Sequence, residues 1–336
     1  MAAPRARRVA PVELPTVLLI VATYAGWLWV THAYRHWPLM VVVPVTTILI
    51  VLHGSVQHEV LHGHPTRWTV VNRLLAIVPL TLWLPFIRYR QNHLAHHTDA
   101  RLTDPLDDPE SFYWRPEDLA KSNSITRALL RIQQTLAGRV IVGSVWHVVT
   151  FLLGDLRDLA RDKNGIRLIW MEHLLWCVPV VLWLKWVCSM PLWLYFFAMA
   201  IPANGMVLIR SFAEHRALPE VRQRIATVER SWILGPLFLF NNLHSLHHES
   251  PWLPWYQYNA RYRAERGRLL AENGGLVYDS YLEVARRFLF RPHDALEHPT
   301  GRVPKDSAGS GQVGSGQAGS SYPAALAARS QSNSVA

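Results

Sequence analysis

The sequence LMVVVPVTTILIVLHGSVQHEVLHGH, residues 39–64, joins an apolar run directly to a cluster of histidines. The apolar part, Leu39 to Leu52, has the composition of a helix inside a lipid bilayer. His58 and His62 follow at a spacing of four residues, which places both rings on one face of a helix. This stretch therefore predicts a metal-binding helix end at a membrane surface.

Three further groups of histidines accompany the first. HLAHH at 93–97 and HSLHH at 244–248 each place an adjacent pair three and four residues after a first histidine, and AEHR at 213–216 contains a single one. Imidazole is the commonest side-chain metal ligand. Nine rings can supply about four or five ligands to each of two metal ions and leave a position open for O2. The predicted metal ligands are His58, His62, His93, His96, His97, His215, His244, His247 and His248.

Four apolar segments decide the fold class. Residues 14–30 and 39–53 predict one helical hairpin, and residues 166–187 and 191–210 predict a second. We therefore expect an all-α integral membrane protein with four transmembrane helices in two hairpins. Other apolar stretches are too interrupted or too short to span, and we expect interfacial segments there. They are residues 70–87, the amphipathic residues 125–156, and residues 232–240.

The polar parts of the chain set the domain boundaries. Residues 101–123 are acidic and predict a loop, and the chain after Asn259 is rich in arginine and soluble in character. We expect a basic N-terminus at 1–13, one membrane domain at 14–302, and a disordered tail at 303–336. The tail is rich in Gly, Ser and Ala, so it has too few large apolar side chains to bury a core.

Charge and aromatic content favour a membrane over nucleic acid as partner. The chain has a net charge of +10 and is 50% hydrophobic, with 15 tryptophans that favour membrane–water interfaces. Arg5, Arg7 and Arg8 predict a cytoplasmic N-terminus, and two hairpins then return the chain to the same side twice. All nine clustered histidines fall on that cytoplasmic side. Cys177 and Cys188 suggest neither a disulfide framework nor a thiolate metal site.

The unclustered histidines have a plainer interpretation. A single histidine near a membrane surface is more often a hydrogen-bonded or interfacial residue than a ligand. We assign that role to His32, His36, His147, His173, His293 and His298. His53 and His64 flank the first cluster and are expected to support it structurally.

HEVLH also matches the zinc metalloprotease motif, in which Glu59 would be the general base. A protease of that kind needs one more ligand, and it leaves both HxxHH clusters unexplained. All-imidazole ligation suits zinc, iron, copper or nickel. Because no side chain removes hydrogen from an unactivated methylene, a cofactor must do so. We therefore expect two non-haem iron ions, with O2 as co-substrate and an alkyl chain as substrate.

HEVLHGH at 58–64, HLAHH and HSLHH resemble the three histidine boxes of the membrane fatty acid desaturase superfamily. His215 resembles an additional ligand known in that superfamily, and the resemblance covers roughly residues 15–260. Glu59 departs from the pattern, since Asp is frequent at that position in the family. The resemblance implies four transmembrane helices, a cytosolic helical cap and a non-haem di-iron centre.

The same resemblance implies a function. We expect an O2-dependent di-iron desaturase that introduces a double bond into a fatty acyl chain of an acyl-lipid, acyl-CoA or acyl-carrier substrate. Electrons would come from a separate protein of ferredoxin, rubredoxin or cytochrome b5 type. The expected location is a bacterial inner membrane, with the active site on the cytoplasmic side. The alternative is a di-iron hydroxylase or oxygenase of a lipid, alkane or terpenoid/carotenoid, and a metal transporter remains as a candidate from another class.

Several neighbouring residues are candidates for supporting roles. Acidic residues after the second cluster can orient imidazoles or form a solvated loop, and amides before the last cluster can bond a ligand or cap a helix. Arginines at the expected membrane rim can hold an anionic headgroup or anchor the chain. The Pro- and Trp-rich PWLPWYQYN can wall a substrate entrance or sit in the interface. These candidates are Asp104, Asp107, Asp108; Asn241, Asn242; Arg88, Arg90, Arg210; and residues 251–259.

Overall fold

The computed structural model describes residues 12–98 and 101–299, and within them nearly all regular structure is helical. The expected all-α fold class is confirmed. A single pair of two-residue parallel strands, β1 (Thr227–Val228) and β2 (Val277–Tyr278), is the exception within the described residues. The predicted boundaries at residues 1–13 and 303–336 fall wholly or largely outside the described residues.

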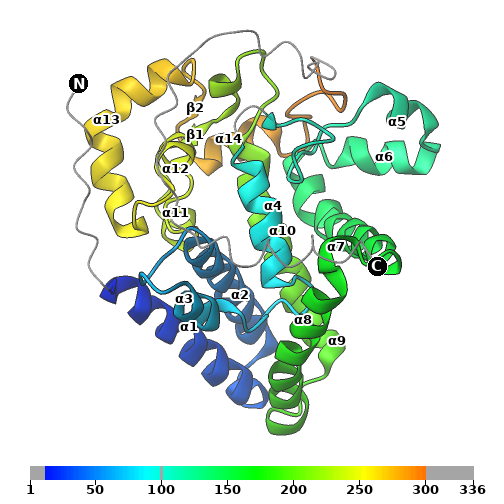
Figure 1. The fold of residues 1–336 in the computed structure, drawn as a ribbon, viewed down its shortest axis with the longest axis vertical. Helices are drawn as coiled ribbons and strands as arrows, with labels where there is room; N and C mark the ends of the chain where they lie inside the picture. The colour runs from blue at the N-terminus through cyan, green and yellow to red at the C-terminus, as the bar shows by residue number, and fades with distance from the viewer. Residues whose placement is uncertain (1–11, 99–100, 300–336) are drawn as a thin grey trace, which may run out of the picture. The chain divides into compact units, whose positions relative to one another are not determined.

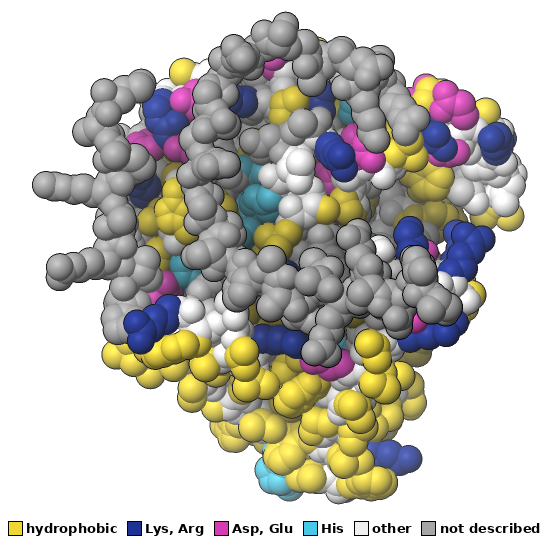
Figure 2. Space-filling view, viewed as in Figure 1, with side chains coloured by type: hydrophobic (Ala, Val, Ile, Leu, Met, Phe, Trp, Pro, Cys, Tyr) yellow, Lys and Arg dark blue, Asp and Glu magenta, His cyan; other side chains and the backbone are white. Residues whose placement is uncertain are grey.

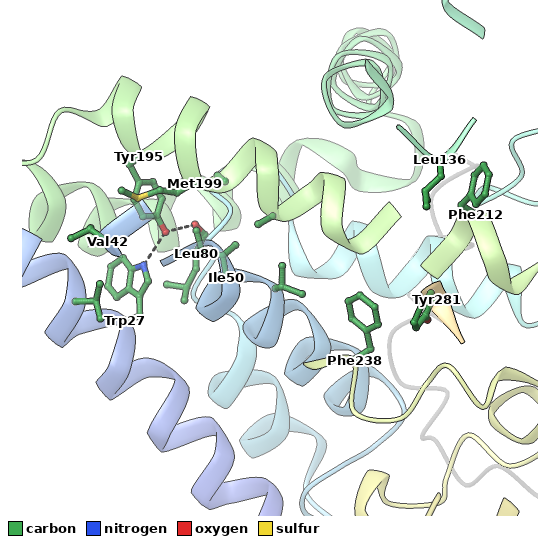
Figure 3. Packing of buried hydrophobic residues seen from close by; sticks show 14 of the residues in the cluster. Trp27, Val42, Ile50, Leu80, Leu136, Tyr195, Met199, Phe212, Phe238 and Tyr281 are labelled. Atoms are coloured by element: carbon green, nitrogen blue, oxygen red, sulfur yellow. Dashed lines mark hydrogen bonds between the residues drawn. The ribbon is translucent and has the colours of Figure 1, made fainter. Parts of the chain in front are cut away.

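The first hairpin consists of α1 (Leu14–His32) and α2 (Leu39–Leu61), which pack along one another. Trp27 of α1 donates its indole N–H to the Tyr195 hydroxyl at 3.0 Å, and Tyr195 donates to the Leu80 carbonyl at 2.6 Å (Figure 3). Such buried polar groups need partners, because nothing in a lipid interior can replace them. This chain of bonds ties the first hairpin to the second.

Each helix of the second hairpin contains a π-helical turn near the loop that joins the two helices. On one side α8 (Ile166–Leu182) continues as a π-helical turn, and on the other α9 (Leu192–Tyr195) continues through a π-helical turn into α10 (Ile201–Glu214). Pro191 precedes α9, at a position where a missing N–H costs no hydrogen bond. α10 ends one residue before His215, so the hairpin delivers that histidine to the same end as α2.

The structure contains five helices long and apolar enough to cross a membrane within the described residues. Four coincide with the predicted spans, and the fifth is α7 (Leu136–Ala160). Both ends of α7 contact segments near the histidines: Ala137 N–H donates to the Leu289 carbonyl, and Asp155 pairs with Arg88. The count of four spans therefore stays a prediction, and these apolar helices fit a membrane protein.

The segments that we expected to lie at the interface or in loops are more structured than predicted. Residues 70–87 contain a short helix followed by turns, and residues 125–156 are divided between two helices by a break at 133–135. The prediction that residues 101–123 form only a loop is wrong at its end, because a short helix forms there. These elements are α3 (Thr69–Ala76), α4 (Phe86–His96), α5 (Pro116–Lys121), α6 (Ser124–Ile132) and α11 (Leu234–Leu237).

The last histidine cluster belongs to a polar half that packs on the ends of the apolar helices (Figure 1). It comprises α12 (His244–Glu249), α13 (Tyr258–Glu272) and α14 (Tyr281–Phe288). Val228 of β1 exchanges bonds with Asn242, as its N–H donates to the Asn242 carbonyl and its carbonyl accepts from the Asn242 amide. The strand pair thus fixes the chain just before α12.

Figure 2 shows how side-chain types divide between these halves. Hydrophobic side chains gather over the region where Figure 1 places α1, α2, α8 and α9, and charged side chains gather over the polar half. The exposed apolar residues include Leu18 and Leu175, which are 58% and 64% exposed. A surface of this kind is stable in lipid rather than in water.

Candidate metal centre

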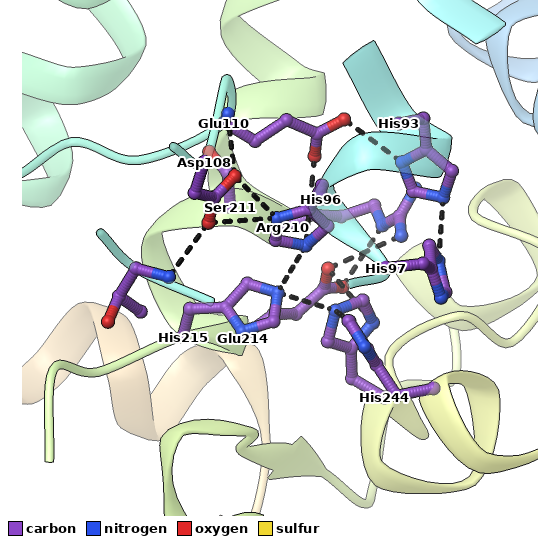
Figure 4. Close-up of polar contacts among 12 residues, drawn as sticks. His93, His96, His97, Asp108, Glu110, Arg210, Ser211, Glu214, His215 and His244 are labelled. Atoms are coloured by element: carbon purple, nitrogen blue, oxygen red, sulfur yellow. Dashed lines mark hydrogen bonds and ion pairs between the residues drawn. The ribbon is translucent and has the colours of Figure 1, made fainter. Parts of the chain in front are cut away.

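All nine predicted ligands converge where α2, α4, α10 and α12 meet (Figure 4). Their ring nitrogens form two groups of four, and within each group the nitrogens lie within 4.8 Å of one another. Group 1 is defined as His58, His62, His93 and His247, and group 2 as His96, His215, His244 and His248. His97 contacts both groups: its Nε2 is 2.9 Å from that of His93 and 3.0 Å from that of His247 in group 1, and its ring stacks on that of His248 in group 2 with the centroids 4.3 Å apart.

Local helix geometry explains why each cluster presents its rings together. His58 lies in the last turn of α2 and His62 is its C-cap, so the two rings point the same way. His96 ends α4 and His97 is its C-cap, while α12 begins at His244. Each cluster thus lies at a helix end, where the next residues can turn away and leave the rings at the centre.

The spacing of the ring nitrogens fits bound cations. A metal–nitrogen bond of about 2.0–2.1 Å places neighbouring ligand nitrogens about 3–3.5 Å apart in a tetrahedral shell. Several Nε2 atoms lie near that separation. These pairs are His62–His93 (3.2 Å), His93–His97 (2.9 Å), His97–His247 (3.0 Å), His96–His215 (2.9 Å), His215–His244 (2.8 Å) and His244–His248 (3.1 Å). His58 Nε2 is buried, and no hydrogen-bond partner exists for it within the described residues.

Burial keeps most of these rings neutral. It holds the pKa of His62, His93, His215 and His247 well below the usual range, and neighbouring histidines reinforce the effect. A neutral imidazole keeps the lone pair that a metal needs. His96 is different, because although burial lowers its pKa, Glu110 and Asp108 outweigh this and raise it to about 9. The negative charge around His96 therefore favours a cation at that position.

Partners on the outer nitrogens fix five of the rings. Such partners set the orientation and basicity of a ligating imidazole. The contacts to Nδ1 are Glu110 on His93 (3.0 Å), Asp108 on His96 (2.9 Å), Glu214 on His244 (3.4 Å), Tyr258 on His247 (3.0 Å) and the Asn241 amide on His58 (3.2 Å). Figure 4 shows Asp108 and Glu110 beside the rings of α4.

Two of the candidate supporting residues therefore reach the centre, Asp108 and Asn241. Asp104 instead accepts the backbone N–H groups of Leu106 and Asp107, as in an ordinary turn. Asn242 bonds the backbone of Val228 and contacts no ligand.

The arginines proposed for the membrane rim behave differently from one another. Arg210 is 8% exposed and pairs with Glu214 on its own helix, so its charge is engaged inside the protein. Arg88 pairs with Asp155 at 2.8 Å. Neither side chain is a free headgroup ligand.

Residues 251–259 border the centre directly. The Trp255 backbone N–H donates to Glu59 at 3.3 Å, and its indole N–H donates to Thr16. Glu59 is thus engaged with this segment and belongs to neither histidine group, which argues against the protease interpretation.

The unclustered histidines lie outside both groups, as expected. His53 bonds Tyr24 and His64 pairs with Glu13, so both support the hairpin. The remaining rings have structural contacts or lie exposed: His147 on Asn204, His173 on the Leu82 carbonyl, His293 on Tyr278 and Asp294, His298 on Thr103, His32 beside Trp183, and His36 at the surface.

Sequence reasoning missed Glu110, Glu214 and Tyr258. Glu214 carried a usable signal, because an acid within an apolar helix four residues after Arg210 implies a buried pair. Glu110 lies in the acidic stretch 101–123 and has no distinguishing neighbour. Tyr258 lies within PWLPWYQYN, where four aromatic residues are equally plausible.

A cavity of about 650 Å³ opens onto both groups. It contacts His58 and His93 of group 1 and also His96, His215 and His244 of group 2. Away from the histidines it is lined by Ile50 and Val51, which lie two helical turns, about 12 Å, below His58 on α2. Its size is that of a small-molecule site.

A sequence comparison identifies the family. The profile of the family described as Fatty acid desaturase matches residues 35–281. No curated protein matches the chain.

Proposed function

This chain belongs to the fatty acid desaturase family, and we propose that it introduces a double bond into a fatty acyl chain, using two non-haem iron ions and O2. The observation that carries this proposal is the convergence of two four-histidine groups on one apolar cavity. A structural metal site would be closed at about four ligands and would need no cavity.

We assign one iron to group 1 and one to group 2, with His97 in contact with both groups. Iron suits imidazole ligands, and when bound it supplies the O2 activation that no side chain can supply. The overall reaction combines –CH2–CH2–, O2, two electrons and two protons to give –CH=CH– and two waters. Two electrons come from the substrate and two from a donor.

The residues of the chain prepare the site for this reaction. Asp108, Glu110 and Glu214 hold three of the rings, which limits the movement of the metal ligands. The apolar wall at Ile50 and Val51 fits methylene groups and excludes water from the alkyl chain. The cavity thus brings an unactivated C–H bond to the histidines and keeps it there.

The reaction needs partners and an orientation. We propose a separate electron donor of ferredoxin, rubredoxin or cytochrome b5 type, and an acyl-lipid, acyl-CoA or acyl-carrier substrate. We also propose that the active site lies on the cytoplasmic side, and the excess of arginine in residues 53–165 and 210–336 supports this orientation.

Lipid analysis tests this function directly. The full chain is expressed in a heterologous bacterium, and total lipids are compared by mass spectrometry with those of a His96→Ala/His97→Ala variant. We expect acyl chains lighter by two hydrogens, absent from the double variant. His36→Ala is the matched control, since this exposed ring lies far along the chain from the clusters.

Two results would change the conclusion. A gain of one oxygen with no new double bond would identify a hydroxylase. A purified protein that takes up no iron would end the proposal for the metal centre.

A further inference from the structure

Arg139 is a buried cation without an acidic partner. It lies in the first turn of α7 and is 3% exposed. Its Nε donates to the Gln133 carbonyl at 2.9 Å, and its guanidinium stacks on the Phe112 ring with the carbon 3.7 Å from the centroid. Nη1 has no hydrogen-bond partner, and no carboxylate within the described residues forms an ion pair with this side chain.

Two other arginines that line the same cavity are paired, and a third, Arg157, is exposed to solvent. Arg210 pairs with Glu214, and Arg115 pairs with Asp118. Burying a charge without a partner is strongly unfavourable, so a retained unpaired guanidinium indicates a group that arrives from elsewhere. The guanidinium is planar and presents its N–H groups in a geometry that fits two oxygens of a carboxylate or phosphate.

Arg139 lies close to group 2. It lines the large cavity and also a smaller one of about 30 Å³, which it shares with His96 and His215. A space of that size holds about two water molecules. Arg139 and two histidines of group 2 therefore line the same small space.

The acids around this space already have partners. Asp294 pairs with Arg216 and His293, and Asp108 accepts from the Thr103 N–H beside His96. Glu110 is engaged with His93. None of these acids pairs with Arg139, which is therefore a buried cation that lines the cavity with part of its guanidinium unsatisfied.

We propose that Arg139 binds the anionic end of the substrate, a carboxylate or phosphate, inside the cavity. The oxidised carbon then lies only a few bonds from that end, and the rest of the alkyl chain extends toward Ile50 and Val51. This inference rests on the proposed function for the identity of the chemistry, and it adds the substrate class and the region of the chain that reacts.

Binding measurements test the anion site without turnover. The full-length iron-loaded protein in an uncharged detergent is titrated with dodecanoate, dodecyl phosphate and dodecanol. We expect one or both anions to bind about 10- to 100-fold more tightly than the alcohol, as for a charge-assisted hydrogen bond. The carboxylate and phosphate arms distinguish a free acid from a phosphorylated headgroup.

Variants assign the effect to this side chain. Arg139→Gln should abolish the preference for the anion and leave dodecanol binding unchanged, whereas Arg139→Lys should retain part of the preference. Arg161→Gln is the matched control, because Arg161 is an exposed arginine at the other end of the same helix. If Arg139→Gln does not fold, Arg139→Lys is compared with the unmodified protein: a reduced anion preference assigns the effect to this side chain, and an unchanged preference overturns the assignment.

Equal affinity for acid and alcohol would overturn the inference, as would oxidation in the distal half of a bound carboxylic acid. A protein that binds the anion but oxidises no chain would refute the proposed function and leave the anion site standing. A protein that desaturates lipids but does not discriminate headgroups would refute the anion site alone.

Discussion

Group 1 and group 2 each consist of four histidines but differ in the residues that contact the outer ring nitrogens. The outer partners of group 1 are a neutral amide, Asn241, a phenol, Tyr258, and Glu110, whose side chain is 31% exposed. Group 2 is supported by Asp108 and Glu214, whose side chains are 2% and 3% exposed, and Glu110 also lies 4.0 Å from His96. A buried carboxylate acts with little solvent screening, whereas an exposed one is screened strongly.

The difference shows that two similar ligand sets need not bind metal equally. A carboxylate on the outer nitrogen makes an imidazole a stronger donor and offsets the charge of the cation. Group 2 should therefore hold its ion more tightly than group 1 and favour the ferric state more. Group 1 is then the more easily reduced and more easily emptied half of the centre.

The largest effect is expected from removing a ligand. His62→Ala should empty group 1, and His244→Ala should empty group 2, so that iron falls from about two ions to about one per chain. Metal analysis of purified protein measures this. His62→Ala should keep the ion of group 2, and His244→Ala should keep the ion of group 1. Complete loss of both ions from either variant would contradict the assignment of one ion to each group.

A smaller effect is expected from removing the buried charge. Asp108→Asn keeps the shape of the side chain but removes its carboxylate from His96, and should weaken iron binding at group 2 by about 10- to 100-fold. Competition with a chelator in a His62→Ala background isolates group 2 for this measurement. Unchanged affinity would mean that the acid contributes only to packing.

Chelation of the unmodified protein should proceed in two steps. Because group 1 lacks a fully buried carboxylate, we expect its ion to leave several-fold faster, roughly in proportion to the difference in affinity. The time course of released iron, compared with that of His62→Ala, measures both phases. If the variant shows the fast phase instead of the slow one, the order of the two groups is reversed.

The smallest effect is expected at Tyr258. Tyr258→Phe removes the 3.0 Å contact to His247 but no charge, so group 1 should lose affinity by less than about 10-fold. The same chelator competition in a His244→Ala background measures it. An effect larger than that of Asp108→Asn would contradict the comparison, because a neutral phenol would then outweigh a buried carboxylate.

The histidines that converge could be predicted from the sequence because the spacing within each cluster is local. An HxxHH pattern places its rings by helix geometry alone, and apolar runs identify both hairpins. The division into groups was not predictable. His93 belongs to group 1 while His96 belongs to group 2, and the last cluster is split in the same way. That division depends on how α4 and α12 pack against each other, and a short sequence motif contains no information about this packing.

The helix α7 shows a second limit of prediction from the sequence. Arg139, His147 and Asp155 interrupt its apolar sequence, and we expected an amphipathic segment at the interface. The structure instead forms one helix that meets the length and hydropathy of a span while both of its ends contact the histidine half. Arg139 lines a cavity that only the three-dimensional structure reveals.

Each group draws ligands from distant parts of the chain, and both require the last cluster. Group 1 spans His58 to His247 and group 2 spans His96 to His248. A nascent chain that has not yet emerged past residue 248 therefore has no complete site and offers only partial, weak chelation. A complete set of four histidines therefore exists in either group only after the last cluster has been synthesised.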